Sequence, residues 1–155
     1  MAHSFGNLAS TLAIRNGTQT GRLVSIGGVA ELRYVVSSVS GIMRLNPHTL
    51  DGLVRRIERR RFSKVPNFWN SLSATAAPLE VPLLIIHNRD DTWVPCGQAE
   101  VLAAAYPETS RTLLTSGLNH HQVMRDQQVL DAIMQFLSEP AVSYTHLTLP
   151  TKRIV

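Results

Sequence analysis

The sequence predicts an α/β fold in which helices cover a parallel sheet. Three observations lead to this class. The segment 81–87 is a continuous apolar run, which is typical of a strand covered on both faces. Shorter strands are predicted over 22–26 and 111–115, each ending at glycine or at serine and glycine. Helical segments alternate with these strands through short connections, and this alternation indicates a parallel sheet.

Four helices are predicted around these strands. The segment 7–14 has good helix formers and an apolar face. The helix over 47–61 begins with an asparagine cap followed by a proline, and both residues suit the start of a helix. The alanine-rich segment 98–106 and the segment 123–137, which has one apolar side, are the other two.

The composition indicates one globular domain. The 155 residues are 44% hydrophobic and 17% charged, which is neither disordered nor fibrous composition. No apolar run reaches the roughly 18–20 residues that span a bilayer, and no signal peptide is visible at the start. The single cysteine, Cys96, leaves no internal disulfide and fits a reducing compartment. We therefore expect a cytoplasmic protein with no membrane partner.

The formal net charge of +4 arises in one segment. Residues 55–61 hold five arginines and one glutamate, which equals the whole excess. A basic binding module built on helix 47–61 is therefore one hypothesis, and it predicts nucleic-acid affinity that falls steeply with salt. Neither interleaved aromatic residues nor a reader motif accompanies the basic run, so we expect no nucleic-acid partner.

Three segments carry residues suited to nucleophilic catalysis. Ser4 stands before a predicted helix with a small residue two positions away on either side, as a sharp strand-to-helix turn requires, although a serine at an ordinary helix N-cap gives the same pattern. Asp91 follows the strand 81–87, and His120 follows the strand 111–115. The carboxyl ends of parallel strands meet at one edge of the sheet, where catalytic groups collect. Serine, acid and histidine occur in this chain order in the α/β-hydrolases.

Taken together, these segments resemble the α/β-hydrolase superfamily. Residues 2–7, Ala-His-Ser-Phe-Gly-Asn, resemble its nucleophile elbow, usually Gly-His-Ser-x-Gly-Gly. Residues 91–95, Asp-Thr-Trp-Val-Pro, resemble the acid loop Asp-x-x-Val-Pro, and residues 117–121, Gly-Leu-Asn-His-His, resemble the histidine loop Gly-x-Gly-His. The resemblance covers residues 1 to about 138. It implies the C-terminal portion of an α/β-hydrolase parallel sheet with flanking helices and a helical cap insertion.

The resemblance implies a serine hydrolase that acts through an acyl-enzyme on a small-molecule ester, amide or thioester. It makes Ser4 the nucleophile, His120 the general base, and Asp91 the carboxylate that orients the imidazole. The backbone N–H of Phe5 would donate to the oxyanion. The partner is then a small-molecule acyl substrate. We expect no cofactor and no metal, and the oligomeric state stays open.

The resemblance also places a cap at about 31–78 within a partial hydrolase domain that covers 1–142. Aromatic residues are the candidates for lining its substrate pocket: Phe62, Phe68, Trp69 and Trp93. Packing of the cap on the main domain explains the first three equally well.

Neighbouring residues compete for two of these roles. Asp90 competes with Asp91, but only Asp91 stands at the family's spacing from Val-Pro. His121 competes with His120, and the glycine-rich lead-in favours His120. His3 is expected to be a buried structural residue of the elbow, because its side chain would point away from that of the serine.

The sequence departs from the family pattern at three positions. Ala2 and Asn7 replace glycines of the elbow, and Asn119 replaces the glycine before the histidine. Alanine is still small, and asparagine can adopt the positive φ that a loop glycine provides. We therefore expect the histidine loop to survive the change at Asn119.

Both ends of the chain depart from the pattern as well. The resemblance implies earlier strands, including the one that presents Ser4, so we expect an N-terminally truncated fragment. Residues 143–155 continue no pattern and resemble translated adapter sequence, so we expect a non-native or disordered tail. The alternative to a serine hydrolase is a non-catalytic half-domain without an assembled active site.

Overall fold

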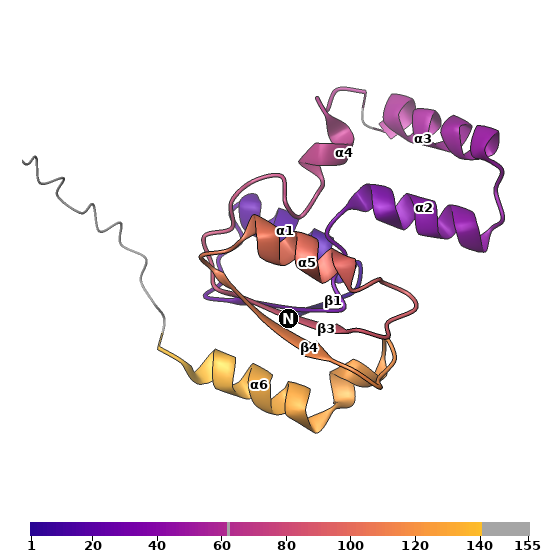
Figure 1. The fold of residues 1–155 in the computed structure, drawn as a ribbon. Coiled ribbons are helices and arrows are strands. Elements are labelled where there is room, and N and C mark those ends of the chain that lie inside the picture. The colour runs from indigo at the N-terminus through magenta and orange to yellow at the C-terminus, as the bar shows by residue number, and fades with distance from the viewer. Residues whose placement is uncertain (62, 141–155) are drawn as a thin grey trace, which may run out of the picture.

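The structure is a computed structural model that describes residues 1–61 and 63–140. Its centre is a sheet of parallel strands in the order β1-β2-β3-β4 (Figure 1). The strands are β1 (Ala2–His3), β2 (Leu23–Ile26), β3 (Leu83–Asn88) and β4 (Ser110–Thr115). All their carboxyl ends therefore lie at one edge of the sheet. The predicted α/β class and the parallel sheet are confirmed.

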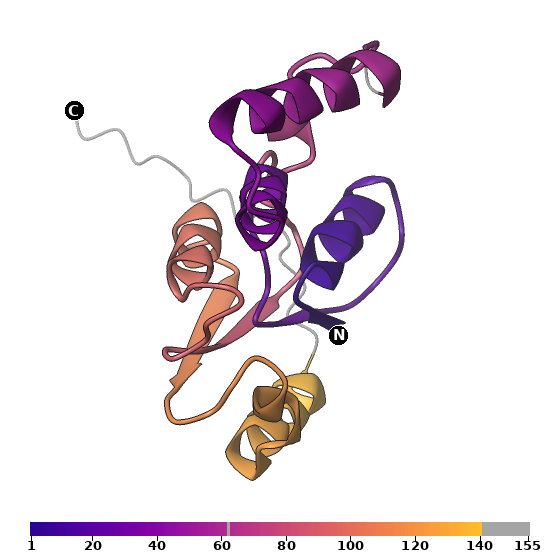
Figure 2. The ribbon, with the colours of Figure 1, turned by 90° about the vertical axis from the view of Figure 1, so that its right-hand side faces the viewer.

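Helices cover both faces of this sheet. α1 (Gly6–Arg15) and α5 (Gly97–Ala105) lie on one face. α6 (Gln127–Ser138) lies on the other face, as Figure 2 shows with the sheet between the two layers. This arrangement is the one that parallel strands require, because a crossover helix has to pack back onto the sheet.

The alternating side chains of β2 and β3 supply two cores. On one face they pack against α1 and α5, in a cluster that includes Leu8, Leu23, Leu83, Ile85 and Leu102. On the other face they pack against α6, in a cluster that includes Val24, Ile26, Ile86, Ile133 and Phe136. Every residue of β3 is buried, which explains why the run 81–87 is apolar without alternation.

Three further helices belong to the segment between β2 and β3. They are α2 (Leu32–Ile42), α3 (Pro47–Arg61) and the short α4 (Phe68–Ser71). Figures 1 and 2 both show α2 and α3 standing away from the sheet, above the layer that α1 and α5 form. We call residues 32–71 the helical insertion.

The predicted elements differ from the structure near both ends of the described chain, and α2 and α4, which fall in the expected helical cap, were not predicted as individual helices. Ala2 and His3 form a short strand paired with Ser25 and Ile26 of β2, so two residues of the strand that presents Ser4 are present. The predicted helix over 123–137 divides into a short 3₁₀ helix, η1 (Gln122–Arg125), and α6. It divides at Asp126, because this residue is extended and its carboxylate accepts a hydrogen bond from the backbone of α6 as an N-cap.

Some expectations fall on residues that the structure does not describe. Phe62 and the predicted tail over 143–155 lie outside the described residues. Within 1–61 and 63–140, no helix combines the length and the apolar character needed to cross a membrane.

Candidate active site

Ser4 lies on a strained turn between β1 and α1. Its φ of 56° falls in the left-handed region, which residues other than glycine seldom adopt. Backbone hydrogen bonds hold this turn: the Ser4 N–H donates to the Ile26 carbonyl at 3.0 Å, and the Ser4 carbonyl accepts from the N–H of Asn7 at 3.1 Å. Strain of this kind persists only where the surrounding structure enforces it, and it clusters at functional sites.

The first residue after this serine is the N-cap of α1. That N-cap is Phe5, and no side chain caps the helix, so Ser4 is not an ordinary capping serine. The Phe5 N–H donates no hydrogen bond to any residue in the described part of the chain. An unpaired N–H at the start of a helix favours a negative charge, and here it directly follows the serine.

Asp91 and His120 form a buried pair at the carboxyl ends of β3 and β4. Nδ1 of His120 lies 2.6 Å from Oδ2 of Asp91. The other carboxylate oxygen accepts hydrogen bonds from the N–H groups of Trp93 at 2.8 Å and Val94 at 2.9 Å. Burial would raise the pKa of the Asp91 carboxyl, but the hydrogen bonds from His120, Val94 and Trp93 outweigh it and hold that pKa below its ordinary value. The carboxylate is therefore ionised at neutral pH.

The two neighbouring competitors have other contacts. Asp90 is exposed, and its carboxylate accepts a hydrogen bond from the Gly117 N–H at 2.7 Å. His121 is exposed and stands with its ring 5.2 Å from that of His120. In this geometry Asp90 supports the histidine loop, while Asp91 contacts the imidazole.

His3 supports the same loop from β1. Its Nε2–H donates to the carbonyl oxygen of His120 at 3.0 Å, and the two rings lie 4.6 Å apart. Partial burial lowers the pKa of His3, and the neighbouring imidazoles of His120 and His121 lower it further. His3 is half-buried rather than fully buried. Although histidines gather here, no group of three or more His, Cys, Asp or Glu side chains in the described ranges is placed to hold a metal ion.

His87 holds the acid loop from within the sheet. This last-but-one residue of β3 is fully buried, and its Nε2–H donates to the Val94 carbonyl at 2.8 Å. The same nitrogen lies 3.8 Å from Oδ2 of Asp91. The turn from Asp91 to Val94 is thus held by the aspartate's own carboxylate and by a strand residue.

Gly27 is a site residue that the sequence analysis did not identify. It follows β2 with a φ of 52°, and a Cβ placed on it would lie 3.2 Å from Cε1 and 3.3 Å from Nδ1 of His120. The imidazole therefore rests against a backbone that has to lack a side chain. The available signal was the pair of glycines after the predicted strand 22–26.

The departures from the family pattern are accommodated in different ways. Asn7 is buried, and its side-chain amide donates to the Val29 carbonyl at 3.0 Å, which ties α1 to the loop after β2. Asn119 is not at positive φ; that conformation occurs at Gly117, with a φ of 78°. The Asn119 side chain instead accepts hydrogen bonds from the backbone N–H groups at 121 and 122.

A cavity of about 590 Å³ opens beside Ser4, and Trp93 lines it. The Trp93 ring also lies nearly parallel to that of His120, with centroids 6.1 Å apart and planes at 13°. Trp93 is therefore a neighbour of both Ser4 and His120, but no hydrogen bond joins Ser4 to His120 in the structure. The Ser4 hydroxyl makes no hydrogen bond to any described residue.

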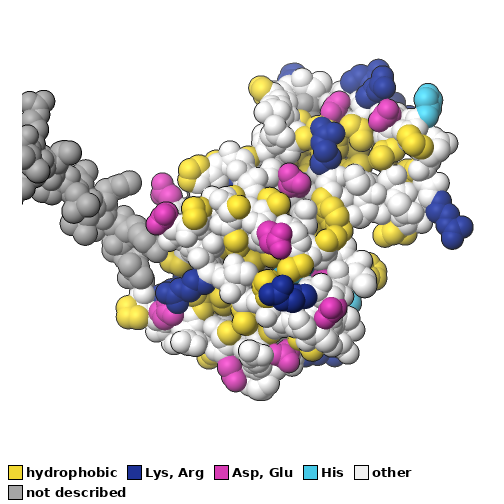
Figure 3. Space-filling view, viewed as in Figure 1, with side chains coloured by type: hydrophobic (Ala, Val, Ile, Leu, Met, Phe, Trp, Pro, Cys, Tyr) yellow, Lys and Arg dark blue, Asp and Glu magenta, His cyan; other side chains and the backbone are white. Residues whose placement is uncertain are grey.

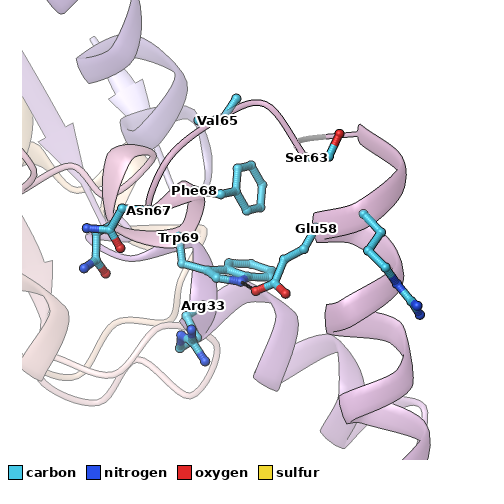
Figure 4. A pocket seen from close by; sticks show the side chains of 9 residues that line it. Arg33, Glu58, Ser63, Val65, Asn67, Phe68 and Trp69 are labelled. Carbon is cyan, nitrogen blue, oxygen red and sulfur yellow. Dashed lines mark hydrogen bonds between the residues drawn. The ribbon is translucent and has the colours of Figure 1, made fainter.

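Phe68 and Trp69 lie away from this cavity, inside the helical insertion. Both are buried and line a separate cavity of about 620 Å³. Figure 4 shows the indole of Trp69 with Glu58 beside it, and the indole N–H donates to that carboxylate. The guanidinium of Arg33 lies 5.3 Å from the same ring. Phe68 and Trp69 also line an apolar cavity of about 390 Å³ together with Phe5, the residue after Ser4, so packing and pocket lining both stay open as their roles.

Solved structures similar to this chain include an α/β-hydrolase and several esterases. One is MGS-MChE2, an α/β-hydrolase enzyme from the metagenome of lagoon sediments at Mar Chica, Morocco, with a TM-score of 0.55 and 14% identity over 87% of this chain and 57% of that one. A thermophilic esterase gives a TM-score of 0.55 with 22% identity, over 88% of this chain and 64% of that one. The esterase RhEst1 from Rhodococcus sp. ECU1013 gives 0.54 with 17% identity, over 88% and 64%.

These comparisons show that the chain has the α/β-hydrolase fold, and the predicted resemblance is confirmed at that level. The chain spans 57% to 64% of the length of these three proteins. No protein-family model matches the sequence, and no curated protein matches it either.

Proposed function

We propose that this chain carries the active site of a serine hydrolase that cleaves a small-molecule ester, amide or thioester through an acyl-enzyme. The observation that carries the proposal is the buried 2.6 Å contact between Asp91 and His120, at the sheet edge that also presents Ser4 on a strained strand-to-helix turn. The fold that the chain shares with known esterases supports this class of reaction.

Each residue has one role in the proposed reaction. Nε2 of His120 takes the proton from the Ser4 hydroxyl as the serine oxygen attacks the acyl carbonyl. The ionised Asp91 accepts the Nδ1–H hydrogen bond and stabilises the imidazolium. The Phe5 N–H donates to the developing oxyanion. The tetrahedral intermediate then collapses, and the leaving group takes the proton from His120.

The second half of the reaction repeats these proton transfers, with water in place of the Ser4 hydroxyl. His120 removes a proton from a water molecule that attacks the acyl-Ser4 ester. The intermediate collapses to the carboxylic acid, and the proton returns to the Ser4 oxygen. Because the water supplies both the hydroxyl and the proton, the enzyme is restored unchanged.

The distance between Ser4 and His120 has to shorten on substrate binding. Catalytic hydrogen bonds are often long in free enzymes and tighten in the substrate complex. The positions of His3 and Trp93 against the imidazole support this step, because they hold the ring while the acyl group enters. In the proposal, the helical insertion serves as the cap over the cavity beside Ser4.

The test is hydrolysis of p-nitrophenyl butyrate by the folded chain and two serine variants. Ser4→Ala removes the nucleophile and is expected to lower kcat by about 10³-fold or more. Ser37→Ala, on the exposed side of α2, is the matched control and is expected to keep wild-type turnover. Circular dichroism confirms that each protein is folded.

Two results would contradict the proposal. Equal turnover by wild type and Ser4→Ala would remove the serine from the mechanism. A folded wild-type chain without any turnover would favour the alternative, a half-domain that lacks an assembled active site.

A further inference from the structure

The cavity beside Ser4 is lined mainly by apolar side chains, with the hydroxyl residues Ser38 and Thr92 among them, and we propose that it binds a linear, uncharged acyl chain of medium length. This inference rests on the proposed function, since it takes Ser4 as the point of attack on the acyl carbonyl. It goes further because it names the part of the substrate that the protein selects, the acyl chain, and the helix that selects it, α2.

The lining of the cavity has no charged side chain among the described residues. Apolar groups come from four segments. They are Phe5 after the serine, Val29 of the loop after β2, three residues of α2 (Val35, Val39 and Ile42), and Trp93 and Val94 of the acid loop. A charged acyl group would lose its hydration here without gaining an ionic partner, which is costly. A hydrocarbon chain would instead be removed from water against these walls.

α2 supplies one wall because of its apolar spacing. Val35, Val39 and Ile42 stand at i, i+4 and i+7, so they fall on one face of the helix. A different face, with Leu32 and Val36, looks into an apolar hollow shared with α1 and α4. Val35 also packs against the core, so the part of α2 that stays open toward Ser4 is formed by Val39 and Ile42.

The open face of α2 carries exposed hydrocarbon. Val39 is 44% exposed and Ile42 is 76% exposed, although both are apolar and line the same cavity as Ser4. Figure 3 shows the molecule hollowed where the lobe of α2 and α3 overhangs the body. The acyl chain of a substrate attacked by Ser4 would lie along this hollow and cover these two side chains.

A hydrogen bond sets the position of this wall relative to the catalytic pair. The Tyr34 hydroxyl donates to the Trp93 carbonyl at 2.7 Å and so joins the start of α2 to the acid loop. Trp93 in turn donates its N–H to Asp91 and lies parallel to His120. The hydroxyl of Tyr34 is engaged by this bond, so it does not add a free polar group to the cavity.

The experiment measures kcat/KM for p-nitrophenyl acetate, butyrate, hexanoate and octanoate. Each buried methylene is expected to raise kcat/KM by about fourfold until the cavity is filled. Ile42→Asn places an amide in the wall, and we expect the ratio of octanoate to acetate kcat/KM to fall by about tenfold. Met43→Asn is the matched control, because Met43 is 62% exposed beside Ile42 but does not line the cavity; its ratio should equal that of the wild type.

A binding measurement separates this inference from the proposed function. Ser4→Ala is titrated with methyl octanoate and with methyl acetate, with quenching of Trp93 fluorescence as the readout and Trp93→Phe as the background. If Ser4→Ala binds methyl octanoate and Ile42→Asn weakens this binding, the acyl site is supported even when no ester is hydrolysed. The lack of hydrolysis then contradicts only the proposed function. Hydrolysis without a chain-length trend, or equal ratios in Ile42→Asn and Met43→Asn, overturns the acyl site and leaves the proposed function standing. If the protein neither binds methyl octanoate nor hydrolyses any ester, both the acyl site and the proposed function are overturned.

Discussion

At the residue scale, the position of the His120 imidazole depends on the absence of a side chain at Gly27. A Cβ at this position would lie 3.2 Å from Cε1 of the ring, and the backbone there has a positive φ. Asp91 and the His3 side chain hold the imidazole and its loop from other directions. The orientation of the His120 imidazole is therefore set jointly by a carboxylate, a second histidine and a glycine.

Gly27→Ala tests this dependence. The added methyl group would lie 3.2 Å from Cε1 of His120, so the ring has to move. A shift of a few tenths of an ångström relieves this contact, and alanine is also strained at the positive φ of this position, so we expect kcat/KM for p-nitrophenyl butyrate to fall by about tenfold. Gly21→Ala is the control, since a Cβ there meets nothing within 4 Å; equal rates in the two variants would mean that the glycine does not position the base.

The pairing of Asp91 with His120 could be anticipated because each residue follows a predicted strand, the buried β3 and the partly exposed β4. The supporting residues were not predictable, because their roles depend on contacts across the sheet. His3 reaches the carbonyl of a residue 117 positions away, and Tyr34 reaches one 59 positions away. Phe68 and Trp69 carried an ambiguous signal, since buried aromatic residues occur in pockets and in packing alike.

At the element scale, Arg15 at the end of α1 joins several elements through hydrogen bonds. The guanidinium of Arg15 donates to the carbonyls of Ser73 at 2.7 Å and Ala77 at 2.9 Å, and also to the carbonyl of Ala74. It donates to the Tyr106 hydroxyl at 3.1 Å as well. One side chain thus joins α1, the chain that returns from the helical insertion, and the end of α5.

Arg15→Met is expected to destabilise the fold. It removes charge-assisted hydrogen bonds to three carbonyls, and we expect the free energy of unfolding to fall by about 2 kcal/mol. None of these carbonyls loses every partner, because the Ala76 N–H still reaches Ser73 and the Tyr106 hydroxyl reaches Ala74 and Ala77. Arg55→Met is the control, because Arg55 pairs with Asp51 only at 4.0 Å with both side chains 70% exposed; its effect should stay within about 0.5 kcal/mol. Urea titration followed by circular dichroism measures both, and equal stability of the two variants would contradict this role of Arg15.

The elements themselves were largely predictable from local patterns. The helix predicted over 47–61 agrees with α3 (Pro47–Arg61), because an asparagine and a proline mark its start and an apolar stripe runs along it. α2 had no comparable start signal, and its N-cap Glu31 makes no capping hydrogen bond. The two-residue strand β1 was invisible, since so short a strand is defined by its pairing with β2 and not by its own sequence.

At the scale of the whole molecule, the sheet brings distant segments to one edge. Ser4, Asp91 and His120 each follow a different strand, and the strands lie side by side in chain order. The parallel sheet was predicted from the alternation of strands and helices, but the order of its strands was not. The helix α3, which carries the basic run, stands away from the sheet (Figures 1 and 2), and the absence of a nucleic-acid partner stays a prediction.

Covalent labelling with a fluorophosphonate asks whether this edge activates a serine, because such probes react with an activated serine hydroxyl. The folded 155-residue chain is incubated with the probe, and mass spectrometry of its peptides locates the adduct. We predict a single adduct on Ser4, which is absent in Ser4→Ala, at least about 10³-fold slower in His120→Gln, and unchanged in Ser37→Ala. A folded chain that stays unlabelled, or one labelled equally fast without His120, would contradict the assignment of Ser4, His120 and Asp91 as a catalytic site.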